Sequence, residues 1–328
     1  MPDTAICPDA IDVVYTWVDD TFPGYADQLG QYAATGHDRN PNRTRDNLEI
    51  LRFSLRSLER FAPFVRKVHL LTCRPQVPGW LDTEHPDVVV HHHDAVMDPA
   101  ILPTFNSFAI VSHLAKLPGV SERFLYCEDD MLFLNDARLA DFLSRDGRAK
   151  IFAKARLAPV HSQLKADTET PWNLALATAN VALDREFSPH RRRFLAHGPR
   201  LIERAVFEEM CDRFPAEIAA TRTARFRTGD NVPPEYLYPH YLLETGRAVL
   251  ADATDSRRMT GYASLENFLP WTWYQLLRLD RQRPVTATLN DSFNKAPNPR
   301  VVAHVRNTLR GWFPQPSRFE RADATLPG

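Results

Sequence analysis

The sequence predicts an α/β fold with a mainly parallel sheet, and two observations carry this prediction. In the first third of the chain, apolar β-branched runs alternate with amphipathic segments of helical period. Carboxylates follow three of these runs directly, at Asp19, at Asp94, and at Asp129 and Asp130. Parallel strands carry their ligand sites beyond their carboxyl ends. We therefore expect these acidic side chains to gather at one edge of the sheet.

The spacing of apolar residues, together with capping and turn residues, predicts the individual helices and strands. A helix is predicted to begin after Asp46, where Glu49 completes a variant of the capping box. Residues 135–190 show a loose pattern and predict an insertion of short strands and loops. Strands are predicted over residues 11–18, 67–72, 88–93, 124–133 and 288–291, and further helices over about 106–117, 198–213 and 234–245.

Residues 124–133, FLYCEDDMLF, are the most informative stretch. An apolar run delivers Asp129 and Asp130 and then returns at once to apolar residues. Two adjacent carboxylates repel each other unless positive charge sits beside them, because unpaired charge is costly away from water. A divalent metal that holds a diphosphate would supply that charge. A solvated turn after a strand accounts equally well for this segment taken alone.

Composition narrows the class of protein. The 328 residues carry 40 basic and 41 acidic side chains, a balance that argues against a nucleic-acid partner. No apolar run approaches the roughly 18–20 residues that span a bilayer, and the first residues lack the pattern of a signal peptide. Cys7, Cys73, Cys127 and Cys211 lie far apart and form no CxxC pair. We expect a cytoplasmic protein, and its composition permits peripheral attachment to a membrane assembly complex.

The sequence contains no glycine-rich motif for binding phosphate. The chain contains neither GxGxxG nor a P-loop, so arginine, a metal or a helix N-terminus must hold any phosphate. The three histidines His91, His92 and His93 form no obvious metal cluster, because alternate side chains of a strand point to opposite faces. We interpret them as the end of a strand and the surface of the sheet.

Several stretches, in order along the chain, resemble the four conserved regions of the Stealth family. That family contains bacterial capsular polysaccharide hexose-1-phosphate transferases and the animal N-acetylglucosamine-1-phosphotransferase α/β subunit. The resemblance covers about two thirds of the chain and departs in the loops around residues 20–45 and 135–195. The stretches are IDVVYTWV, NLEILRFSLRSLERFAPFVRKVHLLT, LPTFNSFAIVSHLAKLPGVSERFLYCEDDMLF, AHGPRLIERAVFEEMCDRFPAEIAATRTARFRTGDN, TLNDS and FPQPSRFE.

The resemblance implies a GT-A-like, Rossmann-type α/β fold with helical additions. We expect a nucleotide-sugar-binding unit over residues 1–135, a variable insertion over 136–195, and the rest of the same catalytic domain over 196–328. The implied reaction moves a sugar-1-phosphate, expected to be N-acetylhexosamine-1-phosphate, from a UDP-sugar such as UDP-N-acetylglucosamine to a hydroxyl of a glycan or cell-surface polysaccharide. A phosphodiester forms and UMP leaves. The alternatives are a GT-A glycosyltransferase that releases UDP, and a non-catalytic nucleotide-sugar-binding component of an assembly complex.

The resemblance also implies the site residues. His197 would be the general base, Arg227 the clamp on the diphosphate, and Asp130 a catalytic carboxylate. Asp130 and Asp291 would bind Mg²⁺ or Mn²⁺. The nucleotide-sugar-binding residues would be Asp12, Tyr15, Trp17, Arg56, Asn106, Ser107, Asp129 and Asp230.

Several of these residues have a structural alternative. Tyr15 or Trp17 would lie in the core if the strand is buried on both faces. Asn106 and Ser107 open a predicted helix and could cap it. Asp291 could form an Asx turn after its short strand.

Overall fold

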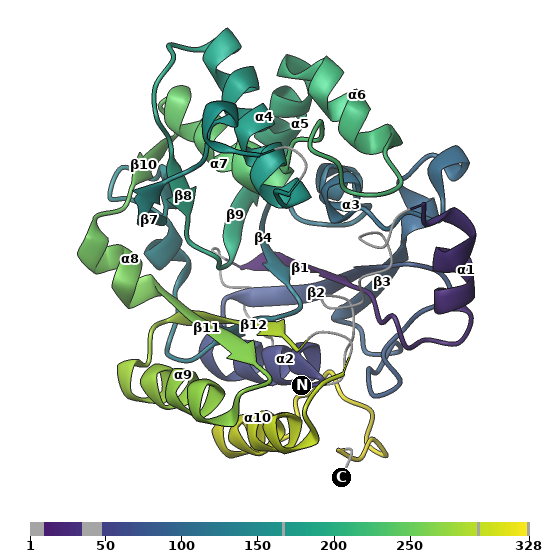
Figure 1. Ribbon diagram of the computed structural model, residues 1–328. Coiled ribbons are helices and arrows are strands. Elements are labelled where there is room, and N and C mark those ends of the chain that lie inside the picture. Colours follow the sequence, from purple (N-terminus) through teal and green to yellow (C-terminus); the bar gives the residue numbers. More distant parts are fainter. Residues whose placement is uncertain (1–9, 35–47, 166–167, 294–295, 327–328) are drawn as a thin grey trace.

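A five-stranded sheet forms the centre of the protein (Figure 1). The computed structural model describes residues 10–34, 48–165, 168–293 and 296–326. The strand order is β3–β2–β1–β4–β9, with the first four strands parallel and β9 antiparallel to β4. The mainly parallel α/β sheet predicted from the sequence is therefore confirmed. The strands span Ile11–Trp17 (β1), Val65–Thr72 (β2), Val88–His92 (β3), Arg123–Glu128 (β4) and Arg200–Glu203 (β9).

Helices cover both faces of this sheet, because its central strands are apolar on both sides. Val14 and Tyr126 face a cluster with helices α3 to α7, whereas Val13 and Tyr15 face α2. Figure 1 shows α3 to α7 above the sheet and α2 below it. The helices span Tyr25–Tyr32 (α1), Ile50–Phe61 (α2), Ser107–Val111 (α3), Pro171–Glu186 (α4), Arg204–Arg213 (α5), Pro215–Thr223 (α6) and Pro234–Glu244 (α7).

A second sheet of three strands lies below the first (Figure 1). Its strand β12 pairs parallel with β11 and antiparallel with β5, and α9 and α10 pack on it through a separate apolar cluster. Two short ladders, β10–β6 and β7–β8, complete the fold with α8. These elements span Met131–Phe133 (β5), Ala149–Ile151 (β6), Ala153–Leu157 (β7), Arg193–Leu195 (β8), Ala248–Leu250 (β10), Ala253–Met259 (α8), Thr260–Glu266 (β11), Leu269–Gln282 (α9), Thr286–Ser292 (β12) and Pro299–Trp312 (α10).

Four sequence predictions are wrong in detail. The single strand over 124–133 is two strands in different sheets, β4 and β5, because the two aspartates break the run. The helix over 198–213 begins only at Arg204, since β9 occupies the preceding residues as an edge strand. The helix over 106–117 is shorter, with α3 followed by a 3₁₀ turn at Leu114–Lys116. Residues 135–190 contain the 16-residue helix α4 as well as short strands.

The expected capping box of α2 is also wrong. Glu49 is itself the N-cap residue, with a left-handed backbone at φ 52°, and it makes no side-chain capping bond. Asp46 lies outside the described residues.

The histidine run is more deeply buried than the sequence suggested. His91 and His93 are buried, and Nε2 of His91 lies 2.9 Å from Nδ1 of His69. Burial lowers the pKa of both His91 and His93 to about 4. These side chains therefore belong to the core, and neither lies at the sheet surface.

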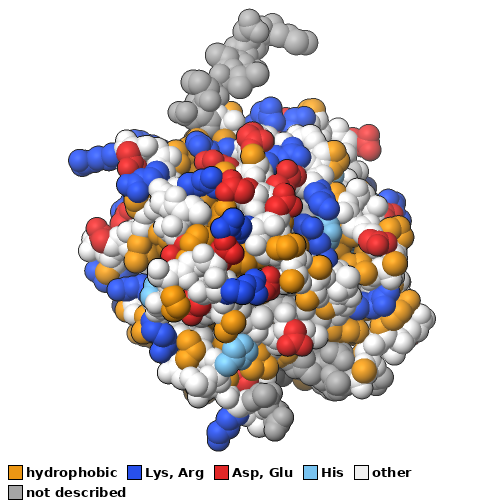
Figure 2. All heavy atoms as spheres, turned by 90° about the horizontal axis from the view of Figure 1, so that it is seen from above, with side chains coloured by type: hydrophobic (Ala, Val, Ile, Leu, Met, Phe, Trp, Pro, Cys, Tyr) orange, Lys and Arg blue, Asp and Glu red, His pale blue; other side chains and the backbone are white. Residues whose placement is uncertain are grey.

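Charged groups are balanced over the surface. On the face seen from above in Figure 2, basic and acidic side chains lie interspersed, in keeping with a net charge of −1. Within the described ranges, the longest apolar helices fall short of what crossing a membrane requires.

A buried ion-pair cluster fixes the C-terminal segment to α2. Nε of Arg52 and Nε of Arg56 each lie 2.6 Å from a carboxylate oxygen of Glu320. All three side chains are at most 3% exposed. Arg56 donates a further hydrogen bond to the carbonyl oxygen of Phe313 at 3.0 Å. The cluster thus holds the C-terminal segment, which is distant in the sequence, against α2 below the central sheet.

Glu320→Gln should lower the free energy of unfolding by about 3–5 kcal/mol, because it leaves the buried guanidinium of Arg56 without its carboxylate and that of Arg52 with only the longer carboxylate contact to Glu49 at 3.6 Å. Denaturant-induced unfolding monitored by circular dichroism measures this change. Asp323→Asn is the matched control, since Asp323 pairs with Arg321 at an exposed site and its loss should leave stability unchanged. Equal denaturant midpoints for the two variants would contradict a stabilising role for the buried cluster around Glu320.

Candidate active site

The candidate site lies where strands of the two sheets converge. Glu128 is the last residue of β4, and Asp130 lies in the turn that leads to β5. The amide of Leu289 in β12 donates to the carbonyl oxygen of Asp130 at 2.9 Å, and Thr288 Oγ1 donates to the carbonyl oxygen of His197 at 3.0 Å. His197 lies three residues before β9, which pairs with β4. Backbone pairing therefore brings together residues that are far apart in sequence.

Glu128 is the centre of the site. Its Oε2 lies 3.0 Å from Nε2 of His197, and its Oε1 lies 3.4 Å from Nη1 of Arg200. A carboxylate oxygen of Asp130 joins Glu128 and His197 in a group whose ligand atoms all lie within 4.8 Å of one another. The side chains of His197 and Glu128 are 25% and 30% exposed, so both can be reached from solvent.

The pairing of Glu128 with His197 stabilises the charged form of each. Burial disfavours the imidazolium of His197, but the charges of Glu128 and Asp130 outweigh burial and raise the pKa of His197. Burial likewise opposes ionisation of Glu128, yet His197 and Arg200 hold its pKa below the ordinary value. The arrangement is a histidine oriented by a carboxylate and able to exchange a proton near neutral pH.

Arg227 approaches the site from the loop before α7. Its Nη2 donates to Ser107 Oγ, and its guanidinium carbon lies 4.8 Å from the ring centre of Phe108. The charge of Arg227 also helps to lower the pKa of Glu128. The structure therefore places Arg227 and Ser107 near the Glu128–His197 pair, and the role of Arg227 as a phosphate clamp stays a prediction.

Glu235, in the first turn of α7, is a second acid near the two arginines. The residue is 7% exposed, and its Oε2 accepts no hydrogen bond from the described residues. Burial and the nearby charge of Glu128 raise the pKa of Glu235 to about 7. Arg200 and Arg227 oppose that shift, which sets Glu235 on the arginine side of the site.

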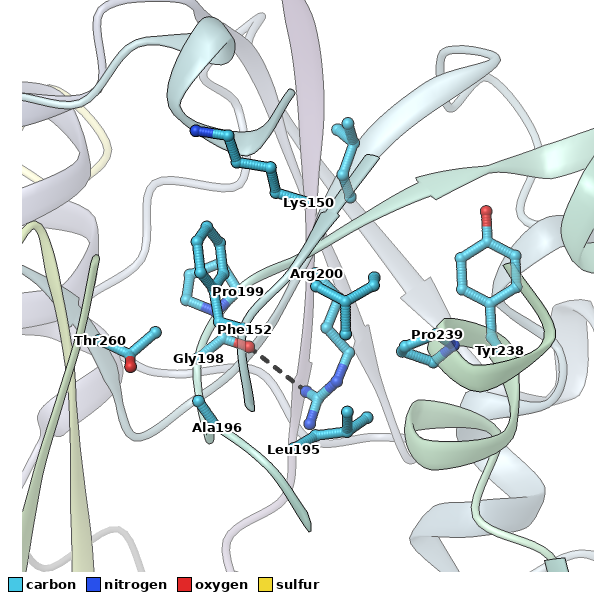
Figure 3. A pocket seen from close by; sticks show the side chains of 12 residues that line it. Lys150, Phe152, Leu195, Ala196, Gly198, Pro199, Arg200, Tyr238, Pro239 and Thr260 are labelled. Carbon is cyan, nitrogen blue, oxygen red and sulfur yellow. Dashed lines mark hydrogen bonds between the residues drawn. The ribbon is translucent and has the colours of Figure 1, made fainter. Parts of the chain in front are cut away.

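A small pocket lies beside Arg200 (Figure 3). Its wall is largely apolar and includes Phe152, Pro199 and Pro239, whereas Arg200 contributes the guanidinium drawn in the figure. Nη1 of Arg200 donates to the carbonyl oxygen of Gly198 at 3.4 Å. Arg200 therefore links this pocket to Glu128.

Glu128, Asp130 and His197 fit a divalent cation by their chemistry. The two carboxylates are the oxygen donors that Mg²⁺ and Mn²⁺ prefer, whereas the imidazole is a ligand typical of softer transition metals. Protonated imidazole cannot bind a metal, so His197 can serve either as a ligand or as a proton carrier at a given moment. Asp291, the second expected ligand, lies at the carboxyl end of β12 but is not in this group. Its role as a ligand stays a prediction.

Four of the expected nucleotide-sugar-binding residues lie elsewhere or are otherwise engaged. Asp12, at the opposite end of β1, is buried and receives hydrogen bonds from Arg66 and from the amide of Ser121. Burial opposes its ionisation, but His69 and Arg66 lower its pKa. Tyr15 is wholly buried and its hydroxyl lies 2.8 Å from Ser54 Oγ.

The other two engaged residues are Arg56 and Asn106. Arg56 belongs to the buried cluster around Glu320. Asn106 is buried, caps α3 and donates to backbone oxygens of the 224–226 segment. Asn106 therefore supports the loop that carries Arg227.

The remaining expected residues are Trp17 and Asp129, at or just beyond strand ends, and Asp230 in a loop. Trp17, the last residue of β1, is 4% exposed and packs in the core cluster below the sheet. Asp129 sits in the β4–β5 turn beside Asp130, and Asp230 is exposed in the loop that follows Arg227. Contact of these three residues with a nucleotide stays a prediction.

Sequence reasoning missed the roles of Glu128, Arg200 and Glu235. Glu128 directly precedes the aspartate pair, so its place in CEDD was the available signal. Arg200 falls within the helix predicted over residues 198–213, but it lies in β9 with its side chain toward Glu128. No local pattern marks Glu235, whose neighbours come from β4 and β9.

Several solved glycosyltransferase structures are similar to this one at low sequence identity. The galactosyltransferase LgtC aligns with a TM-score of 0.44 and 11% identity over 94% of this chain and 98% of its own. GlyE of Streptococcus pneumoniae aligns with a TM-score of 0.41 and 11% identity over 97% of this chain and 66% of its own. These values describe a distant likeness of the fold.

Curated relatives in sequence are phosphotransferases of bacterial polysaccharides. An exopolysaccharide phosphotransferase of Streptomyces coelicolor is 35% identical over 97% of this chain and 55% of its own length. One of Nocardia farcinica is 32% identical over 96% of this chain and 62% of its own. The capsular polysaccharide phosphotransferase SacB of Neisseria meningitidis serogroup A is 28% identical over 95% of this chain and 57% of its own. The chain thus spans a little over half the length of these relatives.

Two family regions match this chain directly. Residues 43–151 match Stealth protein conserved region 2, which contains Glu128 and Asp130. Residues 196–244 match conserved region 3, which contains His197, Arg200 and Arg227. The two matched regions thus meet in space at the Glu128–His197 pair. The chain belongs to the Stealth family.

Proposed function

We propose that this chain transfers a sugar-1-phosphate from a UDP-sugar to a glycan hydroxyl, forming a phosphodiester and releasing UMP. The observation that carries the proposal is the Glu128–His197 pair, set beside Asp130 and flanked by Arg200 and Arg227. The relatives named as polysaccharide phosphotransferases support the same reaction class. We further propose an N-acetylhexosamine as the transferred sugar.

His197 is the proposed general base. Its Nε2 would take the proton of the acceptor hydroxyl as that oxygen attacks the β-phosphorus, the phosphorus atom that carries the sugar. Glu128 orients the ring before the acceptor binds, because its Oε2 lies 3.0 Å from Nε2, and its nearby negative charge would stabilise the imidazolium that forms. The same atom cannot contact Glu128 and the acceptor at full strength, so we propose that the acceptor hydroxyl replaces Glu128 at Nε2 during turnover.

Positive charge for the phosphates would come from Arg200 and Arg227. Guanidinium groups match phosphate oxygens in charge and in geometry. Asp130, together with Asp291 or Glu128, would hold a divalent cation, which neutralises charge on a diphosphate when it is bound. These groups act at phosphate oxygens, which suits attack at phosphorus.

The nucleotide product tests the reaction. Incubated with UDP-N-acetylglucosamine, Mg²⁺ and a panel of glycan acceptors, the protein should release UMP and leave phosphate on the glycan. Chromatography of the nucleotides together with ³¹P NMR of the glycan measures both. UDP as the acceptor-dependent product would show attack at the anomeric carbon and refute the proposal.

Replacing His197 and Asp130 should separate the base from the metal ligand. His197→Ala should lower kcat by about 10²–10⁴-fold at an unchanged half-saturating Mg²⁺ concentration, as the loss of a general base does. Asp130→Asn should instead raise the Mg²⁺ concentration needed for half-maximal activity, because it removes a charged oxygen ligand. Activity titrated with Mg²⁺ measures both effects. A shifted Mg²⁺ requirement in His197→Ala would assign that residue to the metal site.

The acid limb of the pH–rate profile should depend on Glu128. Because Glu128 helps raise the pKa of His197, the wild-type rate should rise with pH through a value above 6.5. Glu128→Gln removes that charge, lowers the pKa of His197 and should move the acid limb of kcat/KM to lower pH. Glu203→Gln is the control, since Glu203 pairs with Arg123 at the other end of β4. If the acid limb of kcat/KM lies at the same pH in Glu128→Gln as in the wild type, the group that titrates there is not His197 paired with Glu128.

A further inference from the structure

Exposed aromatic side chains cluster at the start of α9. Phe268 is 64% exposed, Trp271 40%, Trp273 52% and Tyr274 51%. Half of the large hydrophobic side chains that are exposed in the described residues thus fall within seven consecutive positions. We call these four residues the aromatic patch. Large exposed apolar surface of this kind marks a binding site more often than an ordinary solvated face.

The patch is a property of the helix surface, since α9 already has a buried face. Thr272, Gln275 and Leu276 point into the protein, which leaves the rings on the outer side. Trp271 and Tyr274 are one helical turn apart and their ring centres lie 6.1 Å from each other. No rearrangement of the fold is needed to present them to a ligand.

The patch is anchored to the end of β12, the strand that contacts the candidate active site at Thr288 and Leu289. It follows β11 directly, and the last residue of that strand, Glu266, pairs with Ser292 in β12. Asn267 donates to the carbonyl oxygen of Phe293 and accepts from the amide of Asn298. The start of α9 is therefore fixed to the segment that leaves β12, directly after Asp291. Figure 1 shows α9 returning along the sheet of β11 and β12.

The chemistry of the patch favours an uncharged ligand with apolar faces. Residues 267–277, NFLPWTWYQLL, contain no Asp, Glu, Lys or Arg. The face of an aromatic ring carries negative charge density, and the C–H groups on the face of a sugar ring carry a weak positive charge. Flat rings with few rotatable bonds also bind at low cost in conformational entropy. An anionic lipid surface would instead be expected to meet Lys and Arg here.

We infer that the aromatic patch is a binding subsite for the neutral part of the acceptor glycan, on which its sugar rings stack outside the catalytic centre. The inference rests on the proposed function, because that function requires a glycan hydroxyl at His197, whose carbonyl oxygen accepts from Thr288 in β12. A polymeric acceptor extends beyond the reacting sugar, and the start of α9 is an exposed aromatic surface fixed to the end of the same strand. The patch would hold the polymer while His197 acts on its hydroxyl.

The test measures glycan binding without a donor nucleotide. Native gels containing dextran, mannan, galactan or glycol chitin should retard the wild-type protein in at least one case. The double variant Trp271→Ala/Trp273→Ala should raise the apparent Kd for that polysaccharide by about tenfold or more. Val181→Ala, which removes an exposed apolar side chain from α4, should leave the Kd unchanged. The circular dichroism spectrum and affinity for UMP should be unchanged in both variants.

The other outcomes overturn the inference. Equal retardation of the double variant, or no retardation of the wild type in any gel, excludes glycan binding by the patch. If the wild type, but not the double variant, sediments with vesicles of phosphatidylcholine and phosphatidylglycerol, the patch binds a membrane surface instead. A smaller molar mass of the double variant in light scattering would assign it to a second copy of the chain.

The experiment also separates this inference from the proposed function. Loss of glycan retardation in the double variant would support the patch even if the nucleotide product were UDP. Conversely, if UMP is released and the double variant binds glycan with unchanged affinity, the phosphotransferase activity is supported and the patch is excluded as a glycan-binding subsite. With phosphotransfer established, the double variant should raise the KM for the glycan and leave kcat unchanged.

Discussion

The turn from β4 to β5 is the constraint on which the site depends. The chain leaves the central sheet after Glu128 and enters the second sheet at Met131, so only Asp129 and Asp130 lie between the two layers. Ser57 Oγ accepts from the amide of Phe133 at 2.9 Å, which fixes β5 against α2. Because the turn is short and held on both sides, the carboxylates of Glu128 and Asp130 have little freedom to separate. Repulsion between them must be balanced by groups from other elements.

That balance explains why conserved regions 2 and 3 meet at this point. Region 2 supplies Glu128 and Asp130, and region 3 supplies His197, Arg200 and Arg227. The positive groups lower the pKa of Glu128, while the acids raise that of His197. In the proposed reaction, a diphosphate would compete with Glu128 for Arg200. Such competition would loosen the Glu128–His197 contact while His197, the proposed base, takes its proton.

The fold could largely be predicted from the sequence, whereas the site could be predicted only in part. Strands β1 to β4 show apolar runs, a local signal that periodicity detects, and acids follow those of β1, β3 and β4. The resemblance supplied His197 and Arg227, which have no local signature in this chain. Glu235 and Arg200 gain their importance from neighbours on other strands, and a sequence pattern carries no information about such pairing. The β4–β5 break was marked only by Asp129 and Asp130, and the apolar residues on both sides of them favoured one continuous strand.

The arginines show why residue type alone cannot identify a phosphate clamp. Arg56 and Arg200 carry the same guanidinium group, and both face a glutamate. Glu320 binds Arg56 and Arg52 together in the interior, where a ligand phosphate would have to displace a buried carboxylate at high cost. Glu128 meets Arg200 at 3.4 Å at a partly exposed edge and also pairs with His197. The longer contact and the shared carboxylate leave Arg200 the better placed of the two to exchange its partner for a phosphate.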